Sequence, residues 1–137
     1  MNTILPCQNE LCPHVTSPFG SSNTRPKPHG GVDFNYVGGQ TGINLRNPNV
    51  NSPISGVVTF VGGKYGTIKI QDDKGVSHEI LHTESQSVRK GENIIVGQKI
   101  GTMGNTGPGI KDHHVHYQIK ENGVPVDPQA WWNKQSQ

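Results

Sequence analysis

Short apolar runs separated by turn residues dominate the chain from Ile54 onwards. Apolar and polar positions alternate within several of these runs, and a period of two is the pattern of a β-strand with one buried face. The runs that predict strands are "GVDFNY", "ISGVVTFVG", "GTIKIQD", "SHEILHT", "NIIVGQKIGTMG", "HHVHYQIK" and "VPV". Residues 72–75 form a predicted turn, and residues 121–123 carry an Asn-Gly pair typical of a hairpin. The pattern therefore predicts an all-β meander of short strands.

The other segments show little periodicity. Residues 1–16 are predicted to form an irregular N-terminal arm, residues 17–31 a long loop, and residues 37–53 mostly a second loop. Helix is expected only as a turn within "PQAWW". The length of 137 residues predicts one domain, and a mean hydropathy of -0.61 predicts a thin core of the kind found in small sandwiches and barrels.

Charge and composition exclude several function classes. The net charge of +2 comes without a run of Lys or Arg, so we expect no nucleic-acid partner. No segment is apolar over a membrane-spanning length, and the first residues lack a signal-peptide pattern, so neither membrane insertion nor a leader is expected. Cys7 and Cys12 are expected to be a disulfide or free thiols, which are favoured over a metal site with His14.

Histidines gather in the last long strand. "HHVHYQI" places His114 and His116 on one face, because residues two apart on a strand point the same way, whereas His113 points away. Far upstream, "PHGGVDF" carries His29 and Asp33 in the spacing H-x-x-x-D. Pro28 and two glycines make a helix improbable there, and the glycines suggest a tight turn.

Imidazole and carboxylate groups are good zinc ligands, and a catalytic zinc keeps three protein ligands and one open position. His29 and Asp33 require one more ligand, which either His114 or His116 supplies. A proton donor or acceptor beside the metal is also needed. The candidates are the remaining histidine of the pair, His82 and His78. His78 and His82 would share a face on an uninterrupted strand, so the spacing does not choose between them.

Five segments resemble, in order, the lysostaphin-type (LytM-like) zinc endopeptidases of bacterial cell walls. They are "HGGVDF", "GVVTFVG", "LHTES", "VRKGENIIVGQKIGTMGNTG" and "HHVHYQI", and the resemblance covers roughly residues 17–128. It implies a zinc peptidase catalytic domain over residues 17–137. The implied fold is an antiparallel sheet core of the hybrid-barrel (duplicated hybrid motif) type, with long loops that form a groove. The implied reaction is hydrolysis of peptide cross-links or stem peptides of peptidoglycan.

The resemblance also implies a role for each polar residue of the motifs. His29, Asp33 and His116 would be the ligands of Zn2+, whereas His82 and His114 would be catalytic and would activate the water and stabilise the oxyanion. His78 and His113 correspond to no functional position of the family. The tyrosine that often precedes the H-x-x-x-D motif is absent, which makes Arg25 a candidate substrate-binding residue.

The remaining expectations concern the walls of the groove, the location of the protein and its partner. The segment "TGINLRNPNVN" and the lengthened "NTGPGIKDHHVHYQI" are expected to wall the groove. The substrate lies in the periplasm or cell wall, so the absence of a leader suggests export by a dedicated secretion system, as for an antibacterial toxin, or release as a phage lysin. An exported toxin would also have a protein inhibitor, or immunity partner, in the producing cell.

Two other functions compete with the zinc endopeptidase. One is a catalytically inactive cell-wall-binding or activator module of the same fold, which would not need all five polar positions. The other is a sugar-phosphotransferase domain with paired histidines, which would not need a carboxylate at a ligand position. The complete set of His29, Asp33, His82, His114 and His116 favours the enzyme.

Overall fold

A computed structural model describes residues 3–7, 12–22, 25–36, 48–110 and 113–135 of the chain. Thirteen strands and one helix follow one another in these residues. They are β1 (Pro13–Ser17), β2 (Gly20–Ser22), β3 (Arg25–His29), β4 (Val32–Tyr36), β5 (Asn49–Asn51), β6 (Gly56–Gly62), β7 (Thr67–Gln71), β8 (Ser77–Leu81), β9 (Thr83–Gln86), β10 (Asn93–Ile94), β11 (Lys99–Met103), β12 (Val115–Glu121), β13 (Val124–Val126) and α1 (Pro128–Gln135).

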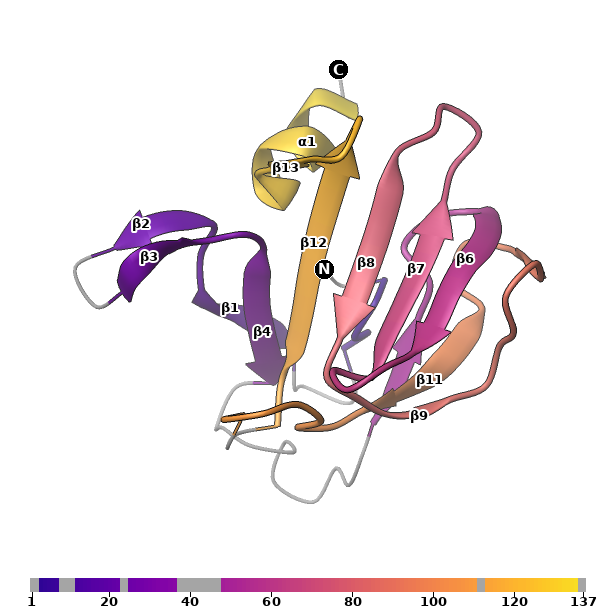
Figure 1. The fold of residues 1–137 in the computed structure, drawn as a ribbon, viewed down its shortest axis with the longest axis horizontal. Helices are drawn as coiled ribbons and strands as arrows, with labels where there is room; N and C mark the ends of the chain where they lie inside the picture. The colour runs from indigo at the N-terminus through magenta and orange to yellow at the C-terminus, as the bar shows by residue number, and fades with distance from the viewer. Residues whose placement is uncertain (1–2, 8–11, 23–24, 37–47, 111–112, 136–137) are drawn as a thin grey trace.

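The strands form one large sheet, one small sheet and a separate hairpin (Figure 1). The order in the large sheet is β1-β4-β12-β8-β7-β6-β10, with β13 paired to β12; the small sheet is β5-β11-β9, and β2 pairs with β3. The pairings from β6 to β8 follow the chain, whereas β12 returns to lie between β4 and β8. All of these pairings are antiparallel, which confirms the all-β prediction.

The alternation of side chains along β12 separates the core from the opposite face of the sheet. Val115, Tyr117 and Ile119 are buried and belong to the hydrophobic core. The intervening positions, His116 and Gln118, belong to the opposite face. The sequence period of two is thus the reason why one strand carries both core residues and candidate site residues.

The C-terminal helix is longer than the turn that the sequence predicts. It spans eight residues, and Trp131 and Trp132 pack against the core. The Trp132 indole Nε1–H donates to the Tyr117 hydroxyl at 2.9 Å, which ties α1 to β12. In Figure 1 the helix lies at the end of β12 that is far from β12's first residues.

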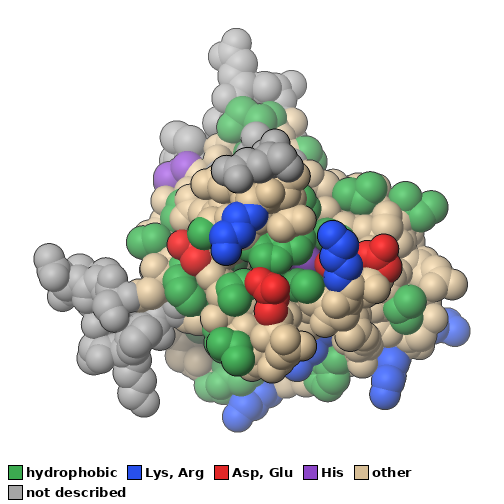
Figure 2. Space-filling view, turned by 90° about the horizontal axis from the view of Figure 1, so that it is seen from above, with side chains coloured by type: hydrophobic (Ala, Val, Ile, Leu, Met, Phe, Trp, Pro, Cys, Tyr) green, Lys and Arg blue, Asp and Glu red, His purple; other side chains and the backbone are tan. Residues whose placement is uncertain are grey.

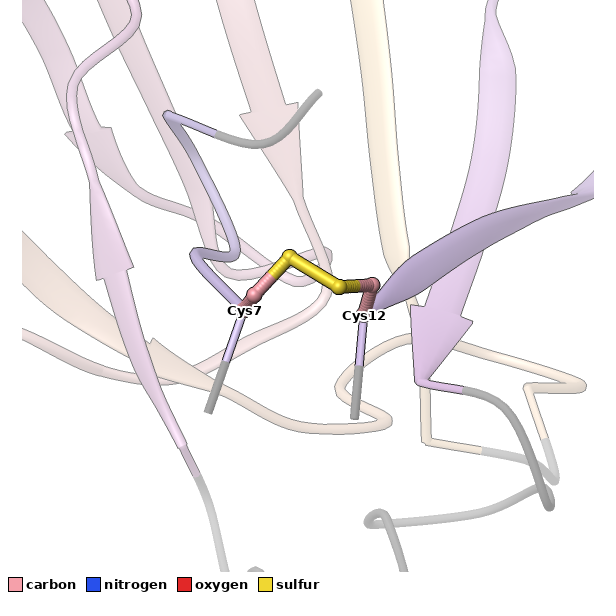
Figure 3. Close-up of a disulfide and its surroundings, with 2 residues drawn as sticks. All are labelled: Cys7 and Cys12. Carbon is pink, nitrogen blue, oxygen red and sulfur yellow. A yellow bond between two sulfur atoms is a disulfide. The ribbon is translucent and has the colours of Figure 1, made fainter. Parts of the chain in front are cut away.

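The N-terminal arm contributes to the core, a role that its irregular sequence does not reveal. Ile4 and Leu5 are fully buried, and the Ile4 carbonyl accepts a hydrogen bond from the Asn51 N–H. Cys7 and Cys12 form a disulfide just before β1, as Figure 3 shows. Of the states considered from the sequence, the structure therefore has the disulfide, whereas the domain boundary at residue 17 stays a prediction.

The surface shows no field of a single charge on the face seen in Figure 2. Lys, Arg, Asp and Glu side chains are interspersed there among hydrophobic and other polar ones. Within the described residues, no helix has the length and apolar character needed to span a membrane. The predicted groove wall at residues 41–51 lies mostly outside the described residues.

Candidate functional site

A cross-strand pair of Asp33 and His116 forms the centre of the site. His116 on β12 lies directly opposite Asp33 on β4 and, on its other side, opposite Leu81 at the end of β8. His116 Nδ1 lies 2.8 Å from Asp33 Oδ1. The register of the sheet therefore brings a carboxylate and an imidazole together across 83 residues of sequence.

His114 lies on the same side as this pair, as its spacing from His116 predicts. Its backbone N–H donates to the Gly104 carbonyl at 3.2 Å, and this isolated bridge fixes the chain just before β12. His114 Nε2 lies 3.7 Å from Asp33 Oδ1, and the side chain is 16% exposed. The ring is thus partly accessible and faces the carboxylate.

His82 reaches the site through an unusual backbone conformation. It follows the last residue of β8 and has a φ of 69°, a left-handed value that is uncommon for a residue other than glycine. Its N–H donates to the Tyr65 carbonyl at 2.6 Å. The centroid of its ring lies 4.9 Å from that of His114 and 5.8 Å from that of His116. The turn thus aims His82 at the other two histidines.

The Thr106 carbonyl sets the tautomer of His82. The carbonyl oxygen lies 2.7 Å from His82 Nδ1 and only accepts hydrogen bonds, so Nδ1 carries the proton and Nε2 carries the lone pair of the neutral ring. Burial lowers the pKa of His82, and the nearby His114 and His116 act in the same direction. The hydrogen bond to Thr106 and the charge of Asp33 oppose that shift in pKa.

His78, the other histidine of "SHEILHT", lies on the core face. Its Nδ1 is 2.7 Å from the Tyr117 hydroxyl, and its ring lies against Trp131, with 4.9 Å between the centroids. Burial lowers its pKa to about 4. The left-handed residue after β8 breaks the alternation, so His78 and His82 do not share a face although an even number of residues separates them.

The glycines of "HGGVDF" serve close packing at this point. Neither Gly30 nor Gly31 has a positive φ, so the expected tight turn does not need glycine's backbone freedom. A Cβ on Gly31 would collide with the Tyr117 carbonyl oxygen and would lie 2.9 Å from His116 Nε2, whereas a Cβ on Gly30 would meet nothing within 4 Å. Gly31 therefore lets the chain before β4 approach the His116 ring.

The described side chains supply two of the three predicted metal ligands. Asp33 and His116 converge, whereas the side chains of His29 and Arg25 lie outside the described residues, although the backbone of both belongs to β3. The described part of the chain contains no group of three His, Cys, Asp or Glu side chains arranged to hold a metal ion. The chemistry of the Asp33 and His116 donors nevertheless fits zinc, which takes carboxylate oxygen and imidazole nitrogen.

The sequence of residues 27–128 matches the profile described as "Peptidase family M23". The chain belongs to peptidase family M23. The match covers the segments that carry Asp33, His82, His114 and His116, and the resemblance drawn from the motifs is confirmed.

Two of the relatives that the chain resembles are named as peptidases. The chain is 32% identical over 108 residues to "Peptidoglycan DD-endopeptidase ShyA" of Vibrio cholerae, which covers 75% of this chain and 23% of the relative. It is 28% identical over 123 residues to an "Uncharacterized metalloprotease" of Haemophilus influenzae, covering 83% of this chain and 24% of the relative. A third match is "Lipoprotein NlpD" of Yersinia enterocolitica, 35% identical over 80 residues, with 54% of this chain and 78% of that protein covered.

The chain spans only 24% of the length of the metalloprotease and 38% of the length of a further relative, the lipoprotein YgeR of Escherichia coli. Among solved structures, a zinc-containing peptidase from Vibrio cholerae superposes with a TM-score of 0.71 at 27% identity, covering 89% of this chain and 37% of that one. Lysostaphin from Staphylococcus simulans superposes with a TM-score of 0.67 at 23% identity, covering 88% and 50%. The antiparallel M23 fold is thereby confirmed.

Several residues of the site escaped the sequence analysis. Tyr65 and Thr106 hold His82 through their backbone carbonyls, and Gln118 and Glu79 form a polar pair beside His116. A backbone contact leaves no signature in the side-chain pattern. The contact between Gln118 and Glu79 depends on strand register. The only signal in the sequence was the spacing of two residues between Gln118 and His116, which indicates a shared face.

Proposed function

We propose that this M23 domain is a zinc-dependent endopeptidase that cleaves peptide cross-links or stem peptides of bacterial peptidoglycan. The observation that carries the proposal is the Asp33–His116 pair with the rings of His82 and His114 beside it. The similarity to a peptidoglycan DD-endopeptidase and to a zinc-containing peptidase supports the substrate class and the metal.

The proposed zinc ligands are His29, Asp33 and His116. Asp33 and His116 offer a carboxylate oxygen and an imidazole nitrogen 2.8 Å apart, and His29 completes the set through the H-x-x-x-D spacing. Bound zinc would supply a Lewis acid that polarises the scissile carbonyl and lowers the pKa of a water molecule. The ligands would hold the zinc ion, which would keep the peptide carbonyl and this water side by side.

The proposed catalytic residues are His82 and His114. Because Thr106 holds the proton on His82 Nδ1, His82 Nε2 is the atom that would take a proton from the attacking water and later pass it to the leaving amine. His114, whose Nε2 faces Asp33, would stabilise the negative charge that develops on the carbonyl oxygen. Arg25 is proposed to bind the substrate. Residues 17–137 are proposed to form the catalytic domain.

A second candidate is a catalytically inactive cell-wall-binding or activator module. The observation in its favour is that some relatives are named as a lipoprotein or as a cell division protein, such as DipM of Caulobacter vibrioides at 26% identity. The polar set argues for the enzyme, because an inactive module has no physical need for His82 in a left-handed conformation beside His114 and His116.

The proposed place of action is the periplasm or cell wall. The disulfide between Cys7 and Cys12 supports an oxidising compartment, because disulfides are rare in the reducing cytosol. The same proposal includes the route out of the cell, which is either export by a dedicated secretion system or release as a phage lysin. It also includes an immunity partner in the producing cell, in the case of an exported toxin.

Single substitutions separate ligands from catalytic residues. We expect His116→Ala to lose bound zinc and hydrolysis together, and His82→Ala to keep zinc but lose at least about 100-fold in kcat/KM on a cross-linked stem peptide. The matched control is His14→Ala, because His14 is an exposed histidine on β1, a strand that carries none of the proposed ligands or catalytic residues. Zinc is measured by metal analysis after dialysis. Full activity of zinc-free His116→Ala would refute the zinc mechanism, and inactivity of zinc-loaded wild type would favour the binding module.

A further inference from the structure

A chain of polar groups extends from the Asp33–His116 pair along the same face of the sheet. His116 Nε2 lies 2.8 Å from Gln118 Oε1, two residues further along β12. Gln118 Nε2 in turn donates to Glu79 Oε1 at 2.6 Å. Glu79 on β8 is the direct cross-strand partner of Gln118, so the register of the sheet fixes this contact.

The hydrogen bonds between Glu79 and His116 have only one direction. An ionised carboxylate accepts hydrogen bonds and does not donate them, so Gln118 must present its NH2 group to Glu79. The amide oxygen of Gln118 then faces His116, and His116 Nε2 must donate to it. Nδ1 is then the nitrogen left for the zinc ion. In the metal-free protein Nδ1 lies 2.8 Å from Asp33 Oδ1, and a carboxylate only accepts, so Asp33 competes with Gln118 for the proton of the neutral ring.

Glu79 is held firmly enough to impose that direction. It is 3% exposed, and it accepts a hydrogen bond from the Ser77 hydroxyl at 2.9 Å on its other oxygen. Lys120 Nζ lies 3.6 Å from Glu79 Oε1. Without this acceptor the Gln118 amide could rotate, because its oxygen and nitrogen ends have nearly the same shape.

We propose that Gln118 and Glu79 are positioning residues that hold a proton on His116 Nε2, leave Nδ1 to bind zinc beside Asp33 and thereby raise the affinity of the site for zinc. The proposal rests on the zinc site of the proposed function. A histidine that binds a metal characteristically donates its other N–H to an oxygen, and loss of such a partner typically weakens metal binding by about 10- to 100-fold.

The tautomer is measured first, in metal-free protein that carries Asp33→Ala, because this substitution removes the competing acceptor at Nδ1. Two-bond correlation spectra of protein with 15N-labelled histidine, recorded at alkaline pH where the rings are neutral, distinguish a proton on Nε2 from one on Nδ1, and His116→Ala assigns the signal. We expect His116 to carry its proton on Nε2 in the Asp33→Ala protein and to be a mixture when Gln118→Leu is added. The matched control is Gln71→Leu, an exposed glutamine on β7 whose side chain bonds the Gly75 carbonyl.

A swap of the pair distinguishes positioning from general stability. Glu79→Gln alone lets the amide at 118 adopt either orientation, whereas Glu79→Gln with Gln118→Glu places a carboxylate against His116 Nε2 and an amide donor behind it. We expect zinc affinity to fall about 10- to 100-fold in Gln118→Leu, to fall in Glu79→Gln, and to recover in the double variant. Thermal unfolding of each variant identifies any that do not fold.

Two outcomes would overturn the proposal. One is a His116 with its proton on Nδ1 in the Asp33→Ala protein, and the other is unchanged zinc affinity in folded Gln118→Leu. Wild-type protein that binds no zinc would instead contradict the proposed function, and the tautomer in metal-free protein would still decide whether Gln118 and Glu79 orient the ring.

Discussion

His78 is a buried imidazole that the fold keeps neutral. Its Nδ1 contacts the Tyr117 hydroxyl, and its Nε2 has no hydrogen-bond partner among the described residues, with Asp72 Oδ2 at 3.7 Å. Burial lowers its pKa to about 4, against 6.5 for an ordinary histidine; Asp72 opposes that shift only in part. Protonation of this ring therefore favours the unfolded chain.

The lowered pKa predicts the direction of the pH dependence. The contribution of His78 to stability is fully present above pH 6.5 and is lost as the pH falls towards 4, which amounts to roughly 3 kcal/mol of unfolding free energy. We expect His78→Gln, which does not titrate, to reduce this loss. Urea unfolding of both proteins from pH 7.5 to 4 measures the difference. Parallel curves for the two proteins would contradict the assignment.

The histidines also show which parts of the site the sequence could predict. His114 and His116 share a face because an uninterrupted strand holds them, and period-two spacing was sufficient there. His82 and His78 needed the motif resemblance, because the left-handed backbone at His82 is not visible in the spacing. The partners of His82 are backbone carbonyls, which no side-chain pattern reports.

At the scale of elements, the junction before β4 positions the site by close packing. A Cβ on Gly31 would meet the backbone oxygen of Tyr117, and backbone cannot move aside as a flexible side chain can. β12 would have to shift relative to β4, and the register that joins Asp33 to His116 would loosen. The sequence reading of the two glycines as a turn missed this difference between them.

Gly31→Ala should therefore weaken the site, whereas Gly30→Ala should not. We expect zinc affinity to fall at least about 10-fold in Gly31→Ala, with a destabilisation of about 1–3 kcal/mol from overpacking. Gly30→Ala is the matched control, because a Cβ there meets nothing within 4 Å. Calorimetric zinc titration and urea unfolding measure the two effects. Equal behaviour of the two variants would show that the close approach is not needed.

The strands were the most predictable elements, and the N-terminal segments were the least. In the runs that became β4, β7 and β12, alternate positions are apolar and buried, as Val32 and Phe34 are in β4. The hairpin of β2 and β3 lies in a segment read as a loop, because its Pro, Ser and Asn residues resemble turn residues. The sequence of the helix α1 is only weakly amphipathic, which is why the pattern predicted a turn there and not a helix of eight residues.

At the scale of the whole molecule, the disulfide ties the buried N-terminal residues to the sheet. It joins Cys7, just after Ile4 and Leu5, to Cys12, next to the first residue of β1. The sequence separation of 5 residues makes the closed loop short, so loop-closure entropy predicts a stabilisation of about 2 kcal/mol. The arm is thus part of the folded unit in an oxidising environment.

Reduction should lower the stability of the domain by that amount. We expect a reductant to lower the unfolding free energy of the wild type by about 2 kcal/mol. The double variant Cys7→Ser with Cys12→Ser should match the reduced wild type and should not respond to the reductant. Urea unfolding under both conditions measures the change. A wild type that is insensitive to a reductant that does cleave the bond would contradict a stabilising role.

The central claim is that Asp33 and His116, with His29, hold a zinc ion that cleaves peptidoglycan peptides. Digestion of purified peptidoglycan from Gram-negative and Gram-positive walls, with and without a chelator, tests it directly when the fragments are read by mass spectrometry. The account predicts release of fragments cut within their peptides, abolished by the chelator and restored by added zinc. Failure to release any such fragment from either wall, by protein that is shown to contain zinc, would contradict the account.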